Sequence, residues 1–126
     1  MRLLLDTQVL IWALRQPDRL AEATRQAITA SETRVFVSMA SPWEMAIKQA
    51  LGNLTPPDDL EAQLEEMRFE LLPIFLRHTR AVAALPHHHG DPFDRMLIAQ
   101  AQVDGMTLVS SDREIGRYQV SLMPAF

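Results

Sequence analysis

The sequence contains no cysteine, and glycine is scarce, with four residues against eight prolines. The missing thiols exclude a disulfide framework and a zinc site built on thiolates, and they favour a reducing compartment. So few glycines argue against a turn-rich all-β chain. The prolines are instead typical of helices with sharply defined starts and ends.

A long hydrophobic run is also missing. The chain starts with MRLLLDTQVLIWAL, but Asp6 and Gln8 interrupt the apolar residues and Arg15 ends them. No small-residue cleavage site follows, and the segment is too short to cross a bilayer. We therefore expect a buried strand that leads into a helix, in a cytoplasmic protein with no membrane association.

Positive charge is in the minority, with 12 lysines and arginines against 16 acidic residues and a formal net charge of −4. This balance argues against binding nucleic acid through a broad basic face. It is compatible with an enzyme that meets nucleic acid locally, through metal ions and a few arginines. With 126 residues, 48% of them hydrophobic, the chain suits a single domain at residues 1–126.

Short apolar runs alternate with amphipathic segments along the chain. We expect strands at residues 2–6, 34–39, 69–74, 107–112 and 118–123, and helices at 7–16, 20–31, 41–51, 55–67, 75–85 and 91–105. This alternation predicts an α/β fold, with a central, mostly parallel sheet flanked by helices on both faces. In such sheets, ligands bind beyond the carboxyl ends of the strands.

Acidic residues fall where that edge is expected. Asp6 ends the first strand and Asp112 follows the strand TLVSS, while Glu44 and Asp94 lie in the first turns of the helices that start with SPWE and DPFD. Carboxylates brought together repel and lose hydration, so such a cluster needs protons or cations between its members. Oxygen ligands without any thiolate predict a hard cation, Mg²⁺ or Mn²⁺.

Each of these short motifs also has a purely structural interpretation. SPWE has the pattern of a capping box, with Ser41 as N-cap and Glu44 returning to its amide, and DPFD repeats it with Asp91 as the cap. Asp112 could likewise start a helical turn. Asp6 is harder to explain in this way, because it closes an apolar strand and precedes an apolar helix.

Acids at one sheet edge, considered together, favour a metal site over separate helix caps. We expect Asp91 to remain a cap and Asp94 to point into the cleft. Phosphate chemistry suits such a site, because a metal held by carboxylates activates water and neutralises charge on a phosphoryl group. We assign Asp6 and Asp94 as the main ligands, with Glu44 and Asp112 completing the metal's surroundings or orienting the attacking water.

Four segments in this order resemble PIN-domain nucleases, most closely the VapC-like toxins of bacterial toxin–antitoxin pairs: LLLDT at 3–7, SPWEMAIK at 41–48, HHHGDPFDRMLIAQA at 87–101 and TLVSSD at 107–112. The resemblance spans nearly the whole chain. It implies a Mg²⁺- or Mn²⁺-dependent endoribonuclease that hydrolyses RNA phosphodiester bonds. The acids of the family fall on Asp6, Glu44, Asp94 and Asp112. A homodimer and an antitoxin that blocks the acidic cleft are implied as well.

Two positions depart from the pattern of the family, and others carry open interpretations. Ser110 stands where the family often has threonine, and Gly90 where relatives often have a basic residue. Thr7 and Ser110 are candidate hydroxyls that support the ligands. Lys48 follows Glu44 by four residues, which suits either a helix salt bridge or a cation near the substrate phosphate.

Several other side chains lie near these motifs in the sequence. Arg95, beside Asp94, allows the same two interpretations as Lys48. Adjacent histidines at 87–89 cannot all face one site and lack zinc-ligand spacing, so we leave them out of catalysis. We expect Trp43 and Phe93 to anchor the core, whereas the helix that carries Trp12 suggests a partner surface.

Three other classes of function compete with a toxin ribonuclease. A non-catalytic PIN-like assembly module would be expected to lose its acids, and all four are present. A phosphoacceptor receiver would want adjacent acids after its first strand, where LLLDT offers only Asp6. A related DNA nuclease stays open, because nothing in the sequence reads the sugar.

Overall fold

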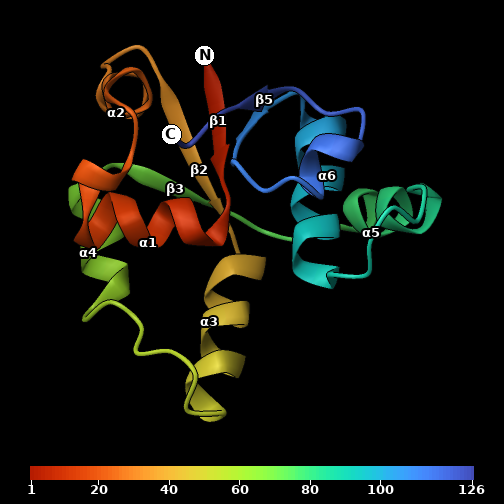
Figure 1. Cartoon of the computed structure of the whole chain (residues 1–126), viewed down its shortest axis with the longest axis horizontal. Helices are drawn as coiled ribbons and strands as arrows, with labels where there is room; N and C mark the ends of the chain where they lie inside the picture. The colour runs from red at the N-terminus through yellow and green to blue at the C-terminus, as the bar shows by residue number, and fades with distance from the viewer.

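The computed structural model describes all 126 residues (Figure 1). Its elements follow in the order β1 (Arg2–Leu5), α1 (Thr7–Arg15), η1 (Pro17–Arg19), α2 (Glu22–Thr29), β2 (Arg34–Ser38), α3 (Ala40–Ala50), α4 (Leu60–Glu66), β3 (Phe69–Leu72), α5 (Leu76–Ala84), α6 (Pro92–Asp104), β4 (Thr107–Val109), η2 (Ile115–Arg117) and β5 (Leu122–Met123). One five-stranded sheet has the order β3-β2-β1-β4-β5, and every neighbouring pair is parallel. The expected α/β fold is confirmed.

Helices cover both faces of this sheet. In Figure 1, α1, α2 and α4 lie on one side of it and α5 and α6 on the other, while α3 extends away from the end of β2. Successive residues of a strand point to opposite faces. Leu3 and Leu5 accordingly join the core under α1 to α4, whereas Leu4 joins the core under α6. Burial on both faces explains why the first strand is apolar at successive positions.

Strand register brings the candidate edge together. Leu5 of β1 is level with Val37 of β2 and with Val109 of β4. The next residue, Asp6, donates its backbone N–H to the Val109 carbonyl across 3.2 Å. β2 and β3 lie on one side of β1, and β4 and β5 lie on the other side. Ligands bind at this kind of reversal in open parallel sheets.

Helix starts differ in one informative case. The predicted cap of the DPFD helix is confirmed, because Asp91 Oδ1 accepts the N–H groups of Phe93 at 2.9 Å and Asp94 at 3.1 Å. The predicted capping box in SPWE is wrong. The helix starts at Ala40, whose N–H is bound by the Ser38 hydroxyl at 3.0 Å, so Ser41 lies inside the helix and is buried. Met39 stands at the N-cap position of this helix and makes no side-chain cap hydrogen bond.

Other boundaries moved for local reasons. The predicted helix at 55–67 is shorter, because α4 begins only after Asp59, a left-handed residue with φ 44° that follows the two prolines. The last predicted strand shrinks to Leu122–Met123. Gly105, the last residue of the predicted helix at 91–105, ends α6 in the left-handed conformation. None of the helices combines the length and apolarity that a membrane crossing requires.

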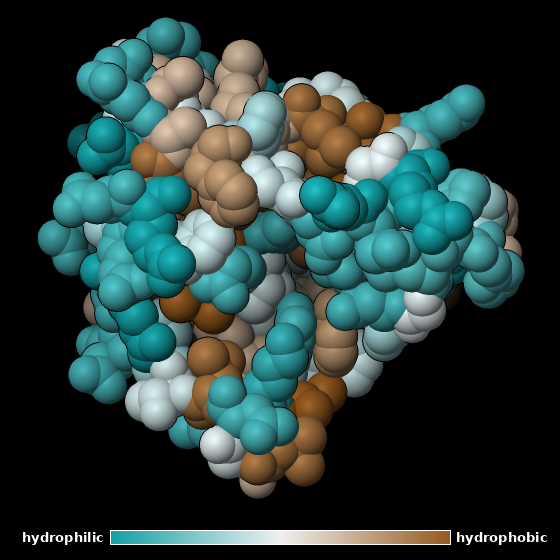
Figure 2. Space-filling model, viewed as in Figure 1, coloured by the Kyte–Doolittle hydropathy of each residue, from teal (hydrophilic) through white to brown (hydrophobic).

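Apolar side chains remain exposed along α3. Met39, Trp43, Ile47 and Leu51 recur every fourth residue and are all exposed, Trp43 by 58%. This spacing places them on one stripe of the helix, and Figure 2 shows apolar surface at the bottom of the view, where α3 ends in Figure 1. The prediction that Trp43 anchors the core is wrong. Its ring instead meets Phe93 edge-on, with 5.1 Å between ring centroids.

Candidate active site

A cavity of about 340 Å³ opens at the carboxyl edge of the sheet. All four predicted acids line it, together with Asp91 and a single lysine: Asp6, Glu44, Asp94, Asp112, Asp91 and Lys48. The acids come from the exit of β1, from α3, from the start of α6 and from the turn after β4. Residues scattered over the sequence therefore share one cavity in which negative charge is in excess.

Asp6 is the most constrained of these acids. Its Oδ1 accepts the Val9 N–H at 2.7 Å, which caps α1, and its carboxylate is also hydrogen bonded to the Ser110 side chain. Burial raises the pKa of Asp6 above the ordinary value, against those two hydrogen bonds, and the charges of Asp112 and Glu44 raise it further. A cation in the cavity would offset this cost of keeping Asp6 ionised.

Glu44 is buried in α3 and held from two sides. Thr7 donates its hydroxyl to Glu44 Oε1 at 2.7 Å and also lies 2.9 Å from the Ser41 hydroxyl. Lys48 Nζ donates to Glu44 Oε2 at 2.7 Å, which confirms the predicted salt bridge. That hydrogen bond raises the pKa of Lys48, as do the charges of Asp91 and Asp94 to a lesser degree. Lys48 thus pairs with Glu44 and lines the cavity at once.

Asp94 lies in the first turn of α6, half-buried. Burial, reinforced by the charge of Asp91, raises the pKa of Asp94 to about 6. His89 Nε2 lies 3.2 Å from Asp94 Oδ2. Sequence reasoning set this histidine aside. The overlooked signal is its place in the short loop that leads into the Asp94 helix, since only one histidine of the triplet needs to face the acid.

Asp112 is the exposed member of the group. Its backbone N–H donates to the Ser110 hydroxyl at 3.1 Å, and its Oδ1 accepts the Glu114 N–H at 2.8 Å. It therefore starts a turn, as the structural interpretation predicted, while it also lines the cavity. Ser110 touches both Asp6 and the Asp112 backbone, which places the predicted supporting hydroxyl between two of the acids.

Arg95 does not belong to the cavity lining, which corrects both roles considered for it. Its buried guanidinium donates to the Pro86 carbonyl at 2.8 Å, to the Tyr118 hydroxyl at 3.0 Å and to the Val82 carbonyl at 3.3 Å. Consecutive residues on a helix point about 100° apart, so the neighbour of Asp94 faces α5 instead of the cavity.

Two lining residues carried no signal in the sequence. Gln8 follows Thr7 at the start of α1, and Asn53 comes from the loop after α3. Both bring amide groups to the cavity rim. Neither residue type indicated a site in the sequence: Gln8 is one polar residue of an apolar helix, and the position of Asn53 depends on how the loop after α3 folds back.

Hard oxygen donors dominate the cavity, which fits Mg²⁺ or Mn²⁺ better than a softer metal. As the side chains lie, no three acidic or histidine residues are grouped closely enough to hold one ion. Lys48 is hydrogen bonded to Glu44, and His89 contacts one carboxylate oxygen of Asp94. Metal binding would thus require these carboxylates to move together.

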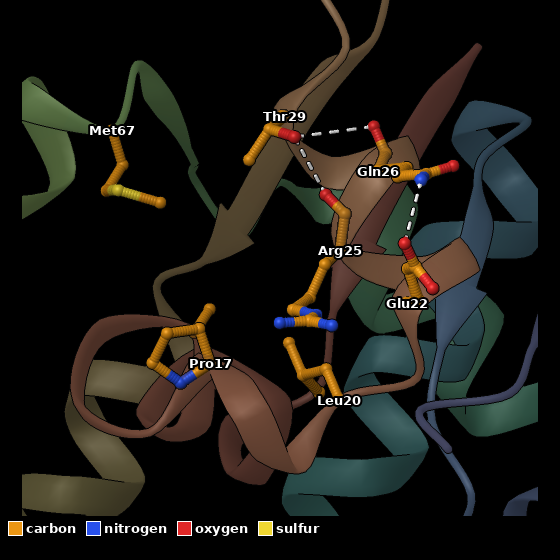
Figure 3. A pocket seen from close by; sticks show the side chains of 8 residues that line it. Pro17, Leu20, Glu22, Arg25, Gln26, Thr29 and Met67 are labelled. Atoms are coloured by element: carbon orange, nitrogen blue, oxygen red, sulfur yellow. Dashed lines mark hydrogen bonds between the residues drawn. The ribbon is translucent and has the colours of Figure 1, made fainter.

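A second hollow, of about 300 Å³, lies between α1, η1 and α2 (Figure 3). Figure 3 shows Arg25 reaching down towards Leu20, while Gln26 donates to Glu22 at 3.4 Å. Glu22 is the only acid in its lining. This hollow therefore lacks the grouped carboxylates that distinguish the cavity at the sheet edge.

Comparisons with known structures agree with this architecture. The fold matches VapBC2 from Rickettsia felis bound to a DNA fragment from its promoter, with a TM-score of 0.74, 16% identity and 98% of both chains covered. It matches DNA-bound VapBC from Salmonella typhimurium with a TM-score of 0.67 and 17% identity, over 100% of this chain and 99% of that one. A toxin–antitoxin complex from Klebsiella pneumoniae gives 0.68 and 16%, over 98% and 97%.

Sequence comparisons complete the assignment. Comparison with curated proteins found no match. A family model for the PIN domain matches residues 3–120, a range that includes all four predicted acids. Since the match covers nearly the whole chain and the observed fold and acidic cavity agree with it, this protein belongs to the PIN domain family, whose members are nucleases.

Proposed function

We propose that this protein is a metal-dependent endoribonuclease and the toxin of a toxin–antitoxin pair. The observation that carries the proposal is the single cavity lined by Asp6, Glu44, Asp94 and Asp112 in a PIN domain. A non-catalytic assembly module would have no need to keep this cluster, whose charges repel and are partly desolvated. Proteins of the same fold occur in the VapBC and toxin–antitoxin complexes described above.

The metal would be Mg²⁺ or Mn²⁺, held mainly by Asp6 and Asp94 and completed by Glu44 and Asp112. When bound, such an ion supplies a nucleophilic hydroxide at neutral pH and neutralises charge on the phosphate. The raised pKa values of Asp6 and Asp94 support this proposal, because both acids gain from a cation that replaces lost hydration.

The surrounding side chains of the protein have distinct tasks in this mechanism. The Ser110 side chain, together with the backbone N–H of Val9, holds the Asp6 carboxylate in one orientation, and the Thr7 hydroxyl does the same for Glu44. Lys48 supplies the one positive charge in the cavity lining and would stabilise a phosphate oxygen as negative charge develops there. These hydrogen bonds limit the rotation of each carboxylate, so the movement that metal binding requires is smaller than it would be for unrestrained side chains.

Partners follow from charge and exposed surface. An antitoxin that blocks the cavity would complement its excess of carboxylates with a basic side chain. The exposed stripe of Met39, Trp43, Ile47 and Leu51 supports a homodimer, because a contiguous apolar helix face gains stability when it is covered by a second copy. We also propose that the protein is located in the cytoplasm, as expected from its sequence.

The decisive experiment is cleavage of a mixed pool of structured RNAs by the purified protein with Mg²⁺, Mn²⁺ or EDTA. Asp94→Asn is the test variant, and Asp104→Asn, at the other end of the same helix, is the matched control. We expect metal-dependent cleavage in the wild type and in the control, and none in the test variant. Equal activity of the two variants would contradict the proposed site.

A parallel arm with single-stranded DNA of matched sequence tests the substrate class. The residues that line the cavity do not by themselves distinguish RNA from DNA. Cleavage of the DNA at rates equal to those for RNA would replace the ribonuclease by a related DNA nuclease, while the acid cluster would keep its assigned role.

A further inference from the structure

We propose that His89 is a positioning residue for Asp94, and that Tyr118 and Arg95 hold it in a single tautomer with the proton on Nε2. The inference rests on the proposed function only for its consequence, the presentation of Asp94 to a metal ion. The tautomer itself follows from contacts within the chain. Neither His89 nor Tyr118 is part of the cavity lining described above.

Contacts on both sides of the imidazole ring define the arrangement. His89 Nε2 lies 3.2 Å from Asp94 Oδ2, and His89 Nδ1 lies 2.8 Å from the Tyr118 hydroxyl. The His89 side chain is only 12% exposed. Both ring nitrogens are therefore engaged, and exchange of either partner for water is restricted.

Counting donors at Tyr118 assigns the proton. A hydroxyl offers one donor and two acceptor positions. Its oxygen receives an N–H from Arg95 at 3.0 Å and the backbone N–H of His89 at 3.3 Å, which use both acceptor positions. The hydroxyl proton can then go only to His89 Nδ1 at 2.8 Å or to the His89 carbonyl at 3.5 Å. The shorter contact makes Nδ1 an acceptor, so the neutral ring carries its proton on Nε2.

The loop that carries His89 is fixed at further points. Arg95 binds the carbonyls of Leu85 and Pro86 at the start of this loop. Arg117 donates to the His88 carbonyl at 2.8 Å. The rings of His88 and His89 both meet Tyr118 edge-on, at 4.8 and 5.4 Å between centroids. A loop anchored in this way aims the ring instead of letting it rotate.

The consequence falls on the Asp94 carboxylate. Nε2–H donates to Oδ2, while Oδ1 makes no hydrogen bond. One oxygen is thus held and the other stays available, which fixes the plane that the carboxylate presents to the cavity. Histidine and carboxylate partners around metal ligands orient them in this way, and their loss typically weakens metal affinity about 10- to 100-fold. Arg95, displaced from the cavity, acts on the site through Tyr118.

The first test is a long-range ¹H–¹⁵N spectrum of the metal-free protein at pH 8, which distinguishes the two neutral tautomers. We expect His89 to carry its proton on Nε2 in the wild type and to lose that single-tautomer signature in Tyr118→Phe. A wild-type His89 protonated on Nδ1 would overturn the inference, whatever the activity of the protein proves to be.

The second test is calorimetric titration with Mn²⁺. We expect His89→Phe to weaken Mn²⁺ binding about 10-fold or more. His89→Gln keeps a donor at the same reach and should lose less than about 3-fold, as should His87→Gln, which changes an exposed histidine of the same loop. Thermal unfolding verifies that each variant is folded. Equal Mn²⁺ affinity of wild type and His89→Phe would overturn the positioning role.

Failure of the proposed function gives a different pattern. A wild type that binds Mn²⁺ and shows the expected variant series, but cleaves neither RNA nor DNA, contradicts the nuclease proposal and supports the role of His89. If the wild type cleaves RNA and His89→Phe has the same Mn²⁺ affinity and cleavage rate, the nuclease proposal is supported and the role of His89 is contradicted. A wild type that binds no Mn²⁺ contradicts both.

Discussion

The two ends of α6 carry the same residue type in opposite situations. Asp94 and Asp104 each face a histidine nitrogen, at 3.2 and 3.0 Å. Asp104 is also gripped by Arg77 through two bonds of 2.9 and 3.1 Å. Hydrogen bonds from Arg77 and then His78 hold the pKa of Asp104 below its ordinary value, whereas burial and Asp91 raise the pKa of Asp94 to about 6.

Different surroundings account for the difference: Asp94 is affected by burial and by the like charge of Asp91, whereas Asp104 has an arginine partner. At the end of α6, Arg77 and His78 bind Asp104 and so connect α5 to α6. The charge of Asp104 is already balanced by Arg77 and is not available to a ligand. At the start of α6 no lysine or arginine pairs with Asp94. Its charge therefore remains available for a bound metal ion. Perturbed acids that are left without a cationic partner mark functional sites more often than structural ones.

The largest expected effect is on catalysis. Asp94→Asn should reduce the rate of RNA cleavage at saturating Mg²⁺ by at least about 100-fold, because a ligand to the activating metal is lost. Asp104→Asn should stay within about 3-fold of the wild type, since it changes no cavity residue. Initial rates on one RNA substrate measure both. A large loss of cleavage rate in folded Asp104→Asn would contradict the functional difference between the two ends of α6.

Metal-dependent stabilisation should follow the same division. Mn²⁺ at about 100 times its dissociation constant stabilises a one-site protein by about 2.7 kcal/mol. We expect thermal unfolding to shift upwards with Mn²⁺ in the wild type and in Asp104→Asn, and to be nearly unchanged in Asp94→Asn. A matched titration with Na⁺ at equal ionic strength controls for screening. A shift retained in Asp94→Asn would place the ion elsewhere.

The position of Asp94 among the other acids could be predicted from sequence, whereas the pairing of Asp104 could not. The acids were placed at one edge because strand exits and the following helix starts share an edge in a parallel sheet, which requires only the order of elements. The direction of each side chain around its helix was harder. Arg95 and Trp43 follow and precede predicted site residues, yet Arg95 turns into the protein and Trp43 out to solvent.

Hydrogen-bond partners that are distant in sequence could not be predicted at all. His89 acquires its role from Tyr118, which belongs to the segment after η2, and no local pattern joins the two. The SPWE motif failed for the opposite reason. Its local pattern was plausible, but the helix already begins at Ala40, soon after β2, with Met39 as its N-cap residue.

A smaller effect is expected on the stability of the metal-free protein. Asp104→Asn should lower the free energy of unfolding by about 1 to 2 kcal/mol, because the bidentate contact with Arg77 is weakened and the buried His78 loses its charged partner. Urea denaturation in EDTA provides the measurement. Arg34, paired with Glu70 on an exposed surface, offers the control, and Arg34→Gln should change stability far less.

The smallest effect concerns pH. The folded pKa of Asp94, about 6, lies above its ordinary value of 3.8, so the native state binds more protons between these values. The contribution of Asp94 therefore makes the metal-free protein more stable as pH falls from 7 to 5. Asp104 has the opposite sign, and its stabilising contribution is lost only as pH falls below the ordinary range of a carboxyl group.

This reasoning gives a test within one variant. In EDTA at pH 7.5, Asp94→Asn should be more stable than the wild type by up to about 1 kcal/mol, after allowance for solvent screening. At pH 5 that advantage should largely disappear, because the wild-type carboxyl is then mostly protonated. Urea denaturation at the two pH values measures the difference. An advantage that grows towards pH 5 would reverse the inferred sign.

The parallel order of the sheet also affects how the protein is made. β1, the first strand synthesised, lies between β2 and β4, and the cavity joins Asp6 to Asp112. During translation, a chain that ends before β4 has neither the strand that completes one side of β1 nor the last acid of the cavity. We therefore expect no nuclease activity from a nascent chain until residues 107–112 have left the ribosome. The fold itself delays activity near the messenger RNA that encodes it.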